Sequence, residues 1–446
     1  MSSVKPSPIE FATAVTIESV TIHTEIAPPV EIAAAVTDID VFEHIDKPYL
    51  TAVVGFVDFE DVVGLLNLSG GEKVIIELKA NIEEAYPVVN KFYIDKIMSS
   101  TKVSDNEEFF TLHLIEDIGF ESNLMNVNKP YTGKSTEIIK TIAKDFLGAE
   151  VDIKANVVQD MKVIVPNLTP IDAMCWVKNR STTFEGYPIY LYSTLVDNSL
   201  QISDLQTILT ELSMNFEEGQ EYTHYESQVN LGIDKTARRV IKGYQSKDTY
   251  DVYKLIDLGL LGAEHQYLDI TKKEGNDRNY NFILDFDMDV IKNTLDKDTS
   301  LTEKTKLIFD KSRHDWSSGD SKINSRKITR IGSANVFNNK NSISQGEDVP
   351  AYKRNEISRT ISQLLTTDPI TFVVNGIDFF SGIKSSTIGN KLTIKFLRNT
   401  KTGDPQELFD FKKSGDYIIF ACKHSFTTTD YTLTFSGVKM YTDGVS

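Results

Sequence analysis

The sequence predicts a β-rich α+β fold, and three observations lead to that expectation. Between Thr16 and Glu116 the chain holds short strand-like runs separated by Pro, Gly, Asp and Asn. A helical period appears only after Glu116, and strand-like runs return near the C-terminus, where two long runs flank the polar segment Thr427–Asp430. β-Branched and aromatic residues fill these runs, as is typical of strands. We therefore expect two β-rich parts with an α+β part between them.

The N-terminal part is expected to form an antiparallel sandwich or barrel. Its predicted strands are Thr16–Thr24, Ile39–Ile45, Leu50–Phe59, Lys73–Ala80, Val89–Ser99 and Glu108–Glu116. Several short strands at this spacing are typical of such folds. Within Lys73–Ala80, the residues Val74, Ile76 and Leu78 share one face, because side chains alternate along a strand. We expect that face to be core and the other face to meet water or a partner.

Two helices are predicted in the middle of the chain. Ser135–Leu147 has a single apolar stripe, with Ser135 as its N-cap and Gly148 at its end. A second helix begins with Thr169 as N-cap, Pro170 in the first turn and an acid at the third position. Its expected buried side consists of Ile171, Met174, Cys175 and Val177 or Lys178. Since strand character returns over Tyr187–Ser193 and Ser199–Ser203, residues 117–208 are interpreted as one α+β unit.

The second half of the chain alternates between strand-like and polar segments. Strand or turn character is predicted over Arg239–Gln245, Tyr253–Gly262, Tyr280–Phe286, Ile370–Phe380 and Lys391–Asn399, and in the terminal hairpin runs Tyr417–Phe426 and Tyr431–Met440. Arg354–Leu365 is moderately helical. Trp316–Pro350 is rich in Ser, Asn, Lys and Gly and is interpreted as a long exposed loop or insertion tip. No exact repeat appears, but the two β-rich ends could be two copies of one barrel type.

Composition limits the possible classes of protein. A length of 446 residues suggests about two to four domains. The formal net charge of −17 disfavours broad binding to a phosphate backbone and argues against a DNA-binding regulator, while it suits a conduit through which DNA slides. No window approaches the roughly 18 uninterrupted apolar residues of a membrane span, and Met1–Glu10 lacks the apolar core of a signal peptide. We expect no membrane insertion.

The motifs that suggest phosphate or calcium binding are incomplete. Gly133–Thr136 is similar to the end of a phosphate-binding loop, but position 128 is Asn instead of the required glycine, and no predicted strand leads into it. A helix start is the favoured interpretation. Asp285–Asp289 carries alternating carboxylates, but Val290 replaces the turn glycine and Asp296 the final Glu of a calcium loop. A strand edge with a solvated acidic face is favoured there.

Catalytic and metal-binding residues are not predicted at any position. The seven histidines lack HxxxH and Cys/His spacing, so a zinc site would need distant ligands brought together by the fold. His424 is interpreted as a barrel-wall or interface residue. Cys175 and Cys422 lie in apolar runs and are expected to be core thiols without a disulfide. Nucleophile and dinucleotide motifs are absent from the sequence, so we expect neither an enzyme nor a cofactor.

Three blocks of the sequence carry a resemblance to a known family. They are Tyr131–Leu147 with Val165–Met174 and Ile189–Tyr192; Arg239–Tyr244 with Leu255–Tyr267; and Val373–Phe379 with the hairpin that begins at Ser414. In this order they resemble the central baseplate hub proteins of contractile-tailed, T-even-like phages, which are related to the base of type VI secretion spikes. Each motif is structural and loose, but together they touch most of the chain.

The resemblance implies a homotrimer in which each chain contributes two tail-tube-like antiparallel β-barrels. The first barrel would be residues 1–116, followed by the α+β domain 117–208. The second would combine 209–262 with 354–446, interrupted by an inserted peripheral domain, 263–353. Three chains would then present six barrels in a ring, which would join the hexameric tail tube above to the trimeric spike below.

The resemblance also implies partners and a location in the virion. These partners are a tail spike protein, the tail tube proteins and, further out, the tape measure and baseplate wedge proteins, after assembly in the host cytoplasm. DNA would pass through the channel without specific binding. Since six residues follow Met440, the spike is expected to be a separate protein. The alternatives are the base of a type VI-like or tailocin spike, and a virion-associated cell-wall hydrolase.

Overall fold

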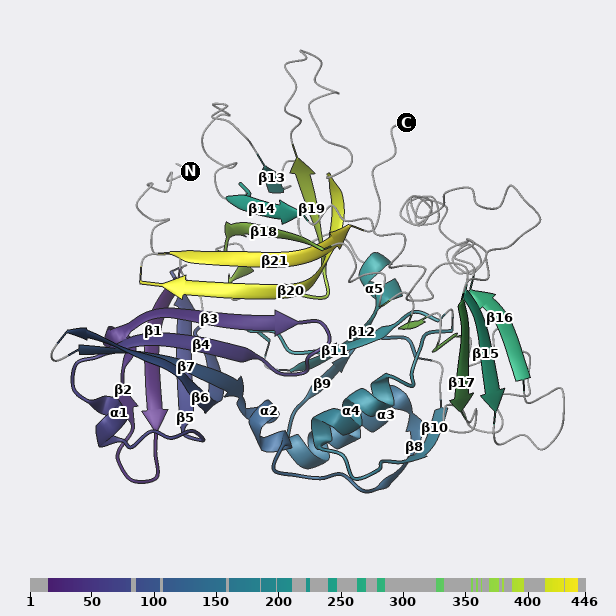
Figure 1. Ribbon diagram of the computed structural model, residues 1–446, viewed down its shortest axis with the longest axis horizontal. Coiled ribbons are helices and arrows are strands. Elements are labelled where there is room, and N and C mark those ends of the chain that lie inside the picture. Colours follow the sequence, from purple (N-terminus) through teal and green to yellow (C-terminus); the bar gives the residue numbers. More distant parts are fainter. Residues whose placement is uncertain are drawn as a thin grey trace, which may run out of the picture.

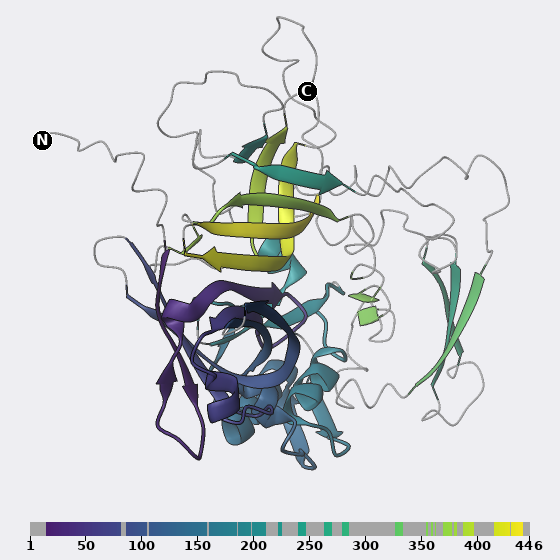
Figure 2. The same ribbon diagram turned by 60° about the vertical axis from the view of Figure 1, so that its left-hand side comes forward.

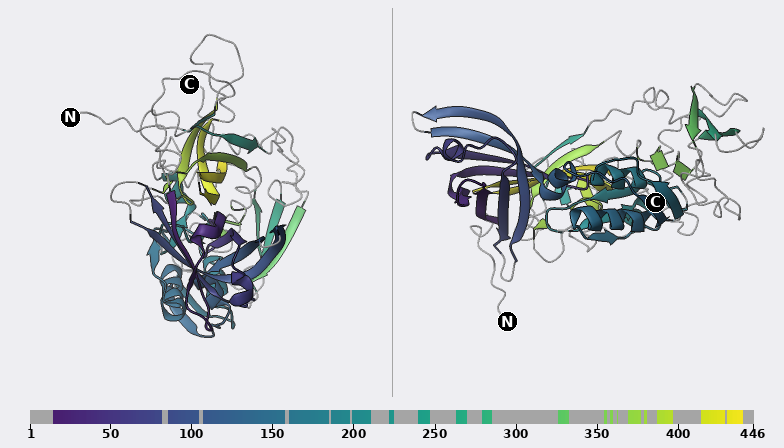
Figure 3. Two further views of the ribbon diagram at one scale, coloured as in Figure 1. Left: turned by 90° about the vertical axis from the view of Figure 1, so that its left-hand side faces the viewer. Right: turned by 90° about the horizontal axis from the view of Figure 1, so that it is seen from below.

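A computed structural model describes two β-rich lobes, an α+β unit and a small separate sheet (Figures 1, 2 and 3). The described residues are 15–81, 86–104, 107–157, 160–184, 186–197, 199–210, 222–224, 240–246, 263–269, 279–284, 326–332, 354–355, 358–359, 362, 369–376, 379–380, 387–396, 414–428 and 430–439. Among these residues, no helix has the length and apolar character needed to cross a membrane.

The first lobe is a strongly curved sheet formed by the N-terminal strands, seen end-on in Figure 2. Its strands are β1 (Val15–His23), β2 (Val30–Glu31), β3 (Val36–His44), β4 (Thr51–Asp58), β5 (Lys73–Ala80), β6 (Val88–Ser104) and β7 (Glu107–Glu116), with the short helices η2 (Ala33–Ala35) and α1 (Val62–Leu65). All six predicted strands are present. In β5, Val74, Ile76 and Leu78 are each 1% exposed, as the alternation predicted.

The second lobe is formed by the C-terminal hairpin and strands that precede it. They are β13 (Tyr222–His224), β14 (Gly243–Ser246), β18 (Ile370–Asn375), β19 (Lys391–Phe396), β20 (Gly415–Thr427) and β21 (Tyr431–Lys439). The predicted terminal hairpin is confirmed, because β20 and β21 pair from Tyr417–Lys439 to Phe426–Tyr431. Tyr431, Leu433 and Phe435 form its buried face.

The two lobes have the same strand order. Read from one edge, the first lobe runs β3-β4-β7-β6-β5-β1 and the second runs β14-β18-β21-β20-β19-β13. If the strands of each lobe, leaving out β2, are numbered in chain order, both lobes show the same order of neighbouring strands. One pairing differs in direction: β1 and β5 are antiparallel, whereas β13 and β19 are parallel. That each lobe is a closed barrel stays a prediction.

The lobes are joined into one sheet of 13 strands, counted over the described residues. The connection is β3 with β20, which pair antiparallel from His44–Ala421 to Asp38–Thr427. Figure 1 shows β20 and β3 lying directly against each other, although they come from opposite ends of the chain. We call this pairing the seam. Backbone hydrogen bonds across it hold the two lobes in a fixed relative position.

The α+β unit has its own apolar core, centred on its two longest helices. Its elements are α2 (Asp117–Ser122), β8 (Pro130–Lys134), α3 (Ser135–Ile142), a π-helical turn (Ala143–Leu147), β9 (Val151–Ile153), β10 (Asp160–Ile164), α4 (Pro170–Lys178), β11 (Ile189–Tyr192), β12 (Leu200–Asp204) and α5 (Leu205–Thr210). On α3, Ile138, Ile139 and Ile142 are buried, as predicted. The predicted cap of α4 is confirmed, since Thr169 Oγ1 accepts a hydrogen bond from the Asp172 N–H at 3.2 Å.

Two expectations about the start of α3 were wrong. The N-cap is Lys134, and Ser135 is the first helical residue, buried with a hydroxyl that has no hydrogen-bond partner among the described residues. In addition, strand β8 leads directly into this helix, although no strand was predicted there. Gly133 in β8 has a φ of 139°, a backbone conformation that favours glycine. The glycine expected at position 128 of a phosphate loop is still absent, so the helix start remains the favoured interpretation.

The separate sheet corrects one further expectation. It comprises β15 (Ala263–Asp269), β16 (Asn279–Leu284) and β17 (Arg326–Gly332), in the order β16-β15-β17. The strand β17 lies within Trp316–Pro350, which was expected to be loop throughout, and it pairs parallel with β15. Ile328 and Ile331 are three positions apart, so this segment lacks the two-residue alternation by which a half-buried strand is recognised in a sequence. The division into four domains is not decided by these pairings and stays a prediction.

Candidate functional site at the seam

The buried face of the seam carries polar side chains where an apolar core would be expected. Along β3, the positions of Ile39, Val41 and Glu43 point into the core; Glu43 is only 3% exposed. Across the seam Glu43 pairs with Cys422, and His424 pairs with Val41. His424 is fully buried. The curvature and register of the seam therefore bring a carboxylate from the first lobe against an imidazole from the second.

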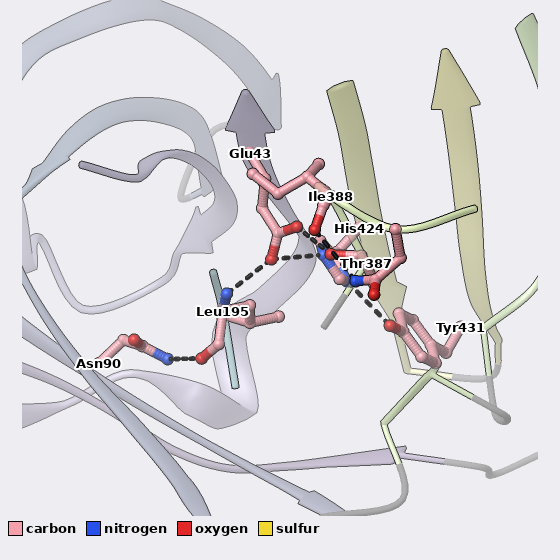
Figure 4. A network of polar contacts seen from close by, with 8 residues as sticks. Glu43, Asn90, Leu195, Thr387, Ile388, His424 and Tyr431 are labelled. Atoms are coloured by element: carbon pink, nitrogen blue, oxygen red, sulfur yellow. Dashed lines mark hydrogen bonds and ion pairs between the residues drawn. The ribbon is translucent and has the colours of Figure 1, made fainter. Parts of the chain in front are cut away.

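Glu43 is the centre of a polar network, shown in Figure 4. Its Oε1 accepts a hydrogen bond from the Leu195 N–H at 2.6 Å and lies 3.1 Å from His424 Nε2. Its Oε2 accepts a hydrogen bond from the Thr387 hydroxyl. The Nε2 atom lies at ion-pair distance from Oε1 but is not aligned for a hydrogen bond. We call Glu43, Thr387, Cys422, His424 and Tyr431 the seam cluster.

The other side of His424 is fixed by an aromatic stack. His424 Nδ1 and the Tyr431 hydroxyl are 2.8 Å apart, which sets the position of the imidazole ring. The Tyr431 and Phe426 rings are nearly parallel, 4.4 Å between centroids. Phe380 packs edge-on against both of them. Tyr431 is 1% exposed and also lies against Gly376, where an added Cβ would come within 2.3 Å of its ring.

The α+β unit reaches the seam cluster through one loop. Leu195 donates its N–H to Glu43, and its carbonyl oxygen accepts a hydrogen bond from Asn90 Nδ2 at 3.2 Å. A second connection joins Lys178 of α4 to Asp46, just after β3, as an ion pair in which the Lys178 side chain is 5% exposed. Both lobes and the α+β unit therefore meet at Glu43, which makes the seam cluster a joint between these three parts.

The outer face of the seam is polar and wetter than the inner face. Asp40 accepts a hydrogen bond from the Ser425 hydroxyl at 2.6 Å and forms an ion pair with Lys423 at 2.7 Å. The Lys423 ammonium also lies 5.8 Å from the centre of the Phe42 ring. These contacts cross the same two strands as the seam cluster, so the seam has cross-strand pairs on both of its faces. Exposed pairs of this kind contribute little, about 1 kcal/mol or less.

The chemistry of the seam cluster favours a structural role over catalysis. Burial and the nearby Glu43 carboxylate raise the pKa of the Cys422 thiol well above its usual value, so the thiol is protonated and a poor nucleophile. Ligand atoms of Glu43, Cys422 and His424 lie within 4.8 Å of one another. The fold therefore brings together residues that are distant in the sequence, as a zinc site in this chain would require. However, both Glu43 oxygens already accept hydrogen bonds, so the carboxylate is satisfied without a metal ion.

Near the seam, the carboxyl of Glu116 has a raised pKa. Burial raises the pKa of its carboxyl to about 8, aided by the Asp117 and Glu43 charges, although Oε2 accepts the Leu50 N–H at 2.7 Å. Because the folded-state pKa is raised, the protonated acid is favoured by folding. The contribution of Glu116 to stability should therefore be greatest below pH 4.5 and should fall between pH 4.5 and about 8, by up to about 1.4 kcal/mol per pH unit.

Glu116→Gln should remove this pH dependence. The amide keeps an oxygen that can accept from Leu50 but cannot ionise, so the variant should gain in melting temperature relative to wild type at pH 8 and not at pH 5. Thermal unfolding at both pH values measures this difference. A variant whose curve stays parallel to that of wild type would show that Glu116 titrates normally in the folded protein.

Several residues that sequence reasoning singled out have defined places. His424 lies in β20 opposite Val41 and is buried in the seam cluster, and its role as a barrel-wall or interface residue stays a prediction. Cys175 and Cys422 are both free thiols, half-buried and buried respectively. Asp285–Asp289 and His314 lie outside the described residues. Glu43 was missed; the available signal was a lone acid at a core position of an alternating strand, two residues after Val41.

Comparisons with known proteins agree with the predicted resemblance at the level of the fold. No protein-family model and no curated protein matches the sequence. Among solved structures, a tail protein from Neisseria meningitidis MC58 is similar to this chain, with a TM-score of 0.51, 11% identity, and coverage of 94% of this chain and 96% of that one. The 43 kDa tail protein of prophage MuSo2 from Shewanella oneidensis is similar at the same TM-score and identity, over 95% and 99% of the two chains.

A component of the type VI secretion system from E. coli is also similar, with a TM-score of 0.41 and 8% identity over 96% of this chain and 79% of that one. The two tail proteins match over nearly their whole length. The chain therefore has the fold of these phage-type tail proteins.

Proposed function

We propose that this protein is the central baseplate hub of a contractile phage-type tail, with a structural and non-enzymatic role. In this proposal, three copies form a ring that joins the hexameric tail tube to a trimeric spike and leaves a channel for the genome. The fold shared with two tail proteins supports a place in a tail. The tape measure and baseplate wedge proteins are the further partners of this proposal.

The observation that carries the proposal is the repeated strand order within one chain. A ring with threefold symmetry can present six similar units to a hexameric tube only if each chain supplies two of them. The two lobes have equivalent neighbours and are fused into one sheet by the seam. Such a joint needs a fixed angle between the lobes, and the buried seam cluster supplies contacts that hold it.

Charge is compatible with passage of DNA through such a ring. The chain has 64 acidic and 47 basic residues. Like charges repel, so an acidic bore would let the phosphate backbone slide without adhering. The alternative within the same class, the base of a type VI-like or tailocin spike, differs in its partners and not in its fold. A cell-wall hydrolase would need a groove with an acid and a nucleophile or metal ion.

Negative-stain imaging of the purified protein, together with its native mass, tests this proposal. The expected result is three times the mass of one chain and a ring with an open centre. Mixing with the cognate spike and tube proteins should then give a complex with one ring of each. A monomer that stays monomeric at high concentration and with both partners would overturn the proposal.

A further inference from the structure

The seam uses one strand edge of each lobe. Each lobe also has the edge that corresponds to the one used by the other lobe, and this edge has no partner strand among the described residues. In the first lobe, β3 contributes its edge to the seam; its equivalent in the second lobe is β14, at the end of the sheet. In the second lobe, β20 contributes its C-terminal half; its equivalent in the first lobe is β6. The unused pair is therefore β6 and β14.

The equivalence of β6 and β20 extends to their irregularities. The first part of β20 pairs with β19, a bulge follows between Ile419 and Ala421, and the remainder pairs with β3 across the seam. The first part of β6 pairs with β5, and a bulge follows between Ile94 and Lys96. Beyond that bulge, β6 pairs with β7 alone in the described part of the chain. A bulge that bends a strand away from one neighbour thus frees it for another.

We infer that β6 of one copy pairs with β14 of the next copy in the way that β20 pairs with β3 within a chain. This inference rests on the proposed function, since it names the contact that would close the trimeric ring. Repeating one heterologous contact around an axis gives a closed ring or an open filament. In a ring of three copies, seams within a chain would alternate with β6–β14 contacts between chains. The six lobes would then be joined by six equivalent contacts.

The second half of β6 exposes apolar side chains next to an edge that lacks a partner strand among the described residues. Met98 is 53% exposed and Val103 is 58% exposed, on a two-stranded extension of β6 and β7 that projects beyond the rest of the first lobe (Figure 3, right). A two-stranded ribbon by itself is marginally stable, and an exposed apolar edge strand is a template for pairing with another chain. A second copy of this chain supplies the matching edge, because β14 pairs with β18 alone among the described strands.

The internal seam also predicts the register of the contact. A row across the first lobe and the seam consists of His113, Val53, Asp40 and Ser425. The corresponding row of the second lobe is Ser436, Thr371 and Gln245. Ser425 is four residues after Ala421, the first residue beyond the bulge of β20. The residue four positions after Lys96, the first beyond the corresponding bulge of β6, is Ser100. A second bulge between Ile97 and Ser99 shifts this by one, to Thr101. Gln245 should therefore face Ser100 or Thr101 of the neighbouring copy.

Disulfide trapping tests this contact in the full-length protein. In a Cys175→Ser background, Gln245→Cys is combined with Ser100→Cys or with Thr101→Cys, and the protein is oxidised and run on a non-reducing gel. We expect a covalent trimer from one of the two pairs. The matched control is Gln245→Cys with Lys91→Cys, an equally exposed position on the part of β6 that pairs with β5; it should give no covalent trimer.

Native mass measured under reducing conditions separates the possible failures. A trimer that forms no disulfide with either pair would overturn the β6–β14 contact and leave the proposed hub intact. A chain that stays monomeric at high concentration and with its spike and tube partners would overturn both. Cross-linking of the control pair at the same rate as the test pairs would also overturn the contact, because it would mark random collision.

Discussion

Replacing Glu43 by alanine should lower the free energy of unfolding by roughly 2–6 kcal/mol, because it leaves two buried donors unpaired at about 1–3 kcal/mol each. The variant would leave the Leu195 N–H and the Thr387 hydroxyl without their common acceptor and would remove the carboxylate that lies 3.1 Å from His424 Nε2. Since those groups come from the α+β unit and the second lobe, we expect the loss of stability to be concentrated where these parts meet β3. Denaturant unfolding measures the change in stability, and hydrogen exchange locates it in β3 and β20.

Matched variants on the same strand separate the seam cluster from general damage to β3. Asp40→Ala removes the exposed pair with Lys423 on the outer face and should cost about 1 kcal/mol or less. Glu43→Gln keeps an acceptor oxygen but loses the charge, so its cost should be intermediate. If Glu43→Ala proved no more destabilising than Asp40→Ala, the cluster would not hold the lobes together.

The coupling between Glu43 and His424 can be measured directly. A double-mutant cycle with Glu43→Ala and His424→Ala isolates their interaction from the other contacts of each residue. We expect a coupling of about 1–3 kcal/mol, because the residues are in contact and share a network. Additive losses would mean that His424 is held by Tyr431 alone.

Much of the local structure followed from the sequence, because strand alternation is a local property. The spacing of Val74, Ile76 and Leu78 was sufficient to identify the core face of β5, and the run Tyr431–Phe435 did the same for the final hairpin. The cap of α4 was predictable from Thr169 and Pro170, which act within one helical turn. In each case the relevant partners are a few residues apart.

The seam cluster could not be predicted in the same way. Glu43 and His424 are separated by most of the chain, and their meeting depends on the register of β3 against β20. A shift of one residue would turn Glu43 to the outer face, and nothing local to either strand sets that register. Ser135 illustrates a smaller failure: its cap preference was overridden because strand β8 continues directly into the helix and buries it.

Removing the buried ring of Tyr431 should lower the free energy of unfolding about as much as replacing Glu43 by alanine. Tyr431→Ala removes a fully buried ring from the stack with Phe426 and Phe380 and the hydroxyl that contacts His424, so we expect a loss of roughly 3–5 kcal/mol. Tyr431→Phe keeps the ring and removes only the hydroxyl, with an expected cost of about 1–2 kcal/mol.

A third variant tests the same packing from the opposite side. Gly376→Ala leaves Tyr431 intact but places a methyl group where its ring now lies, so the ring must move. Overpacking of this kind typically costs about 1–3 kcal/mol. The three variants should therefore rank Tyr431→Ala, then Gly376→Ala, then Tyr431→Phe in denaturant unfolding. Equal losses for Tyr431→Ala and Tyr431→Phe would assign the stabilisation to the hydroxyl contact with His424, because the ring would then contribute nothing.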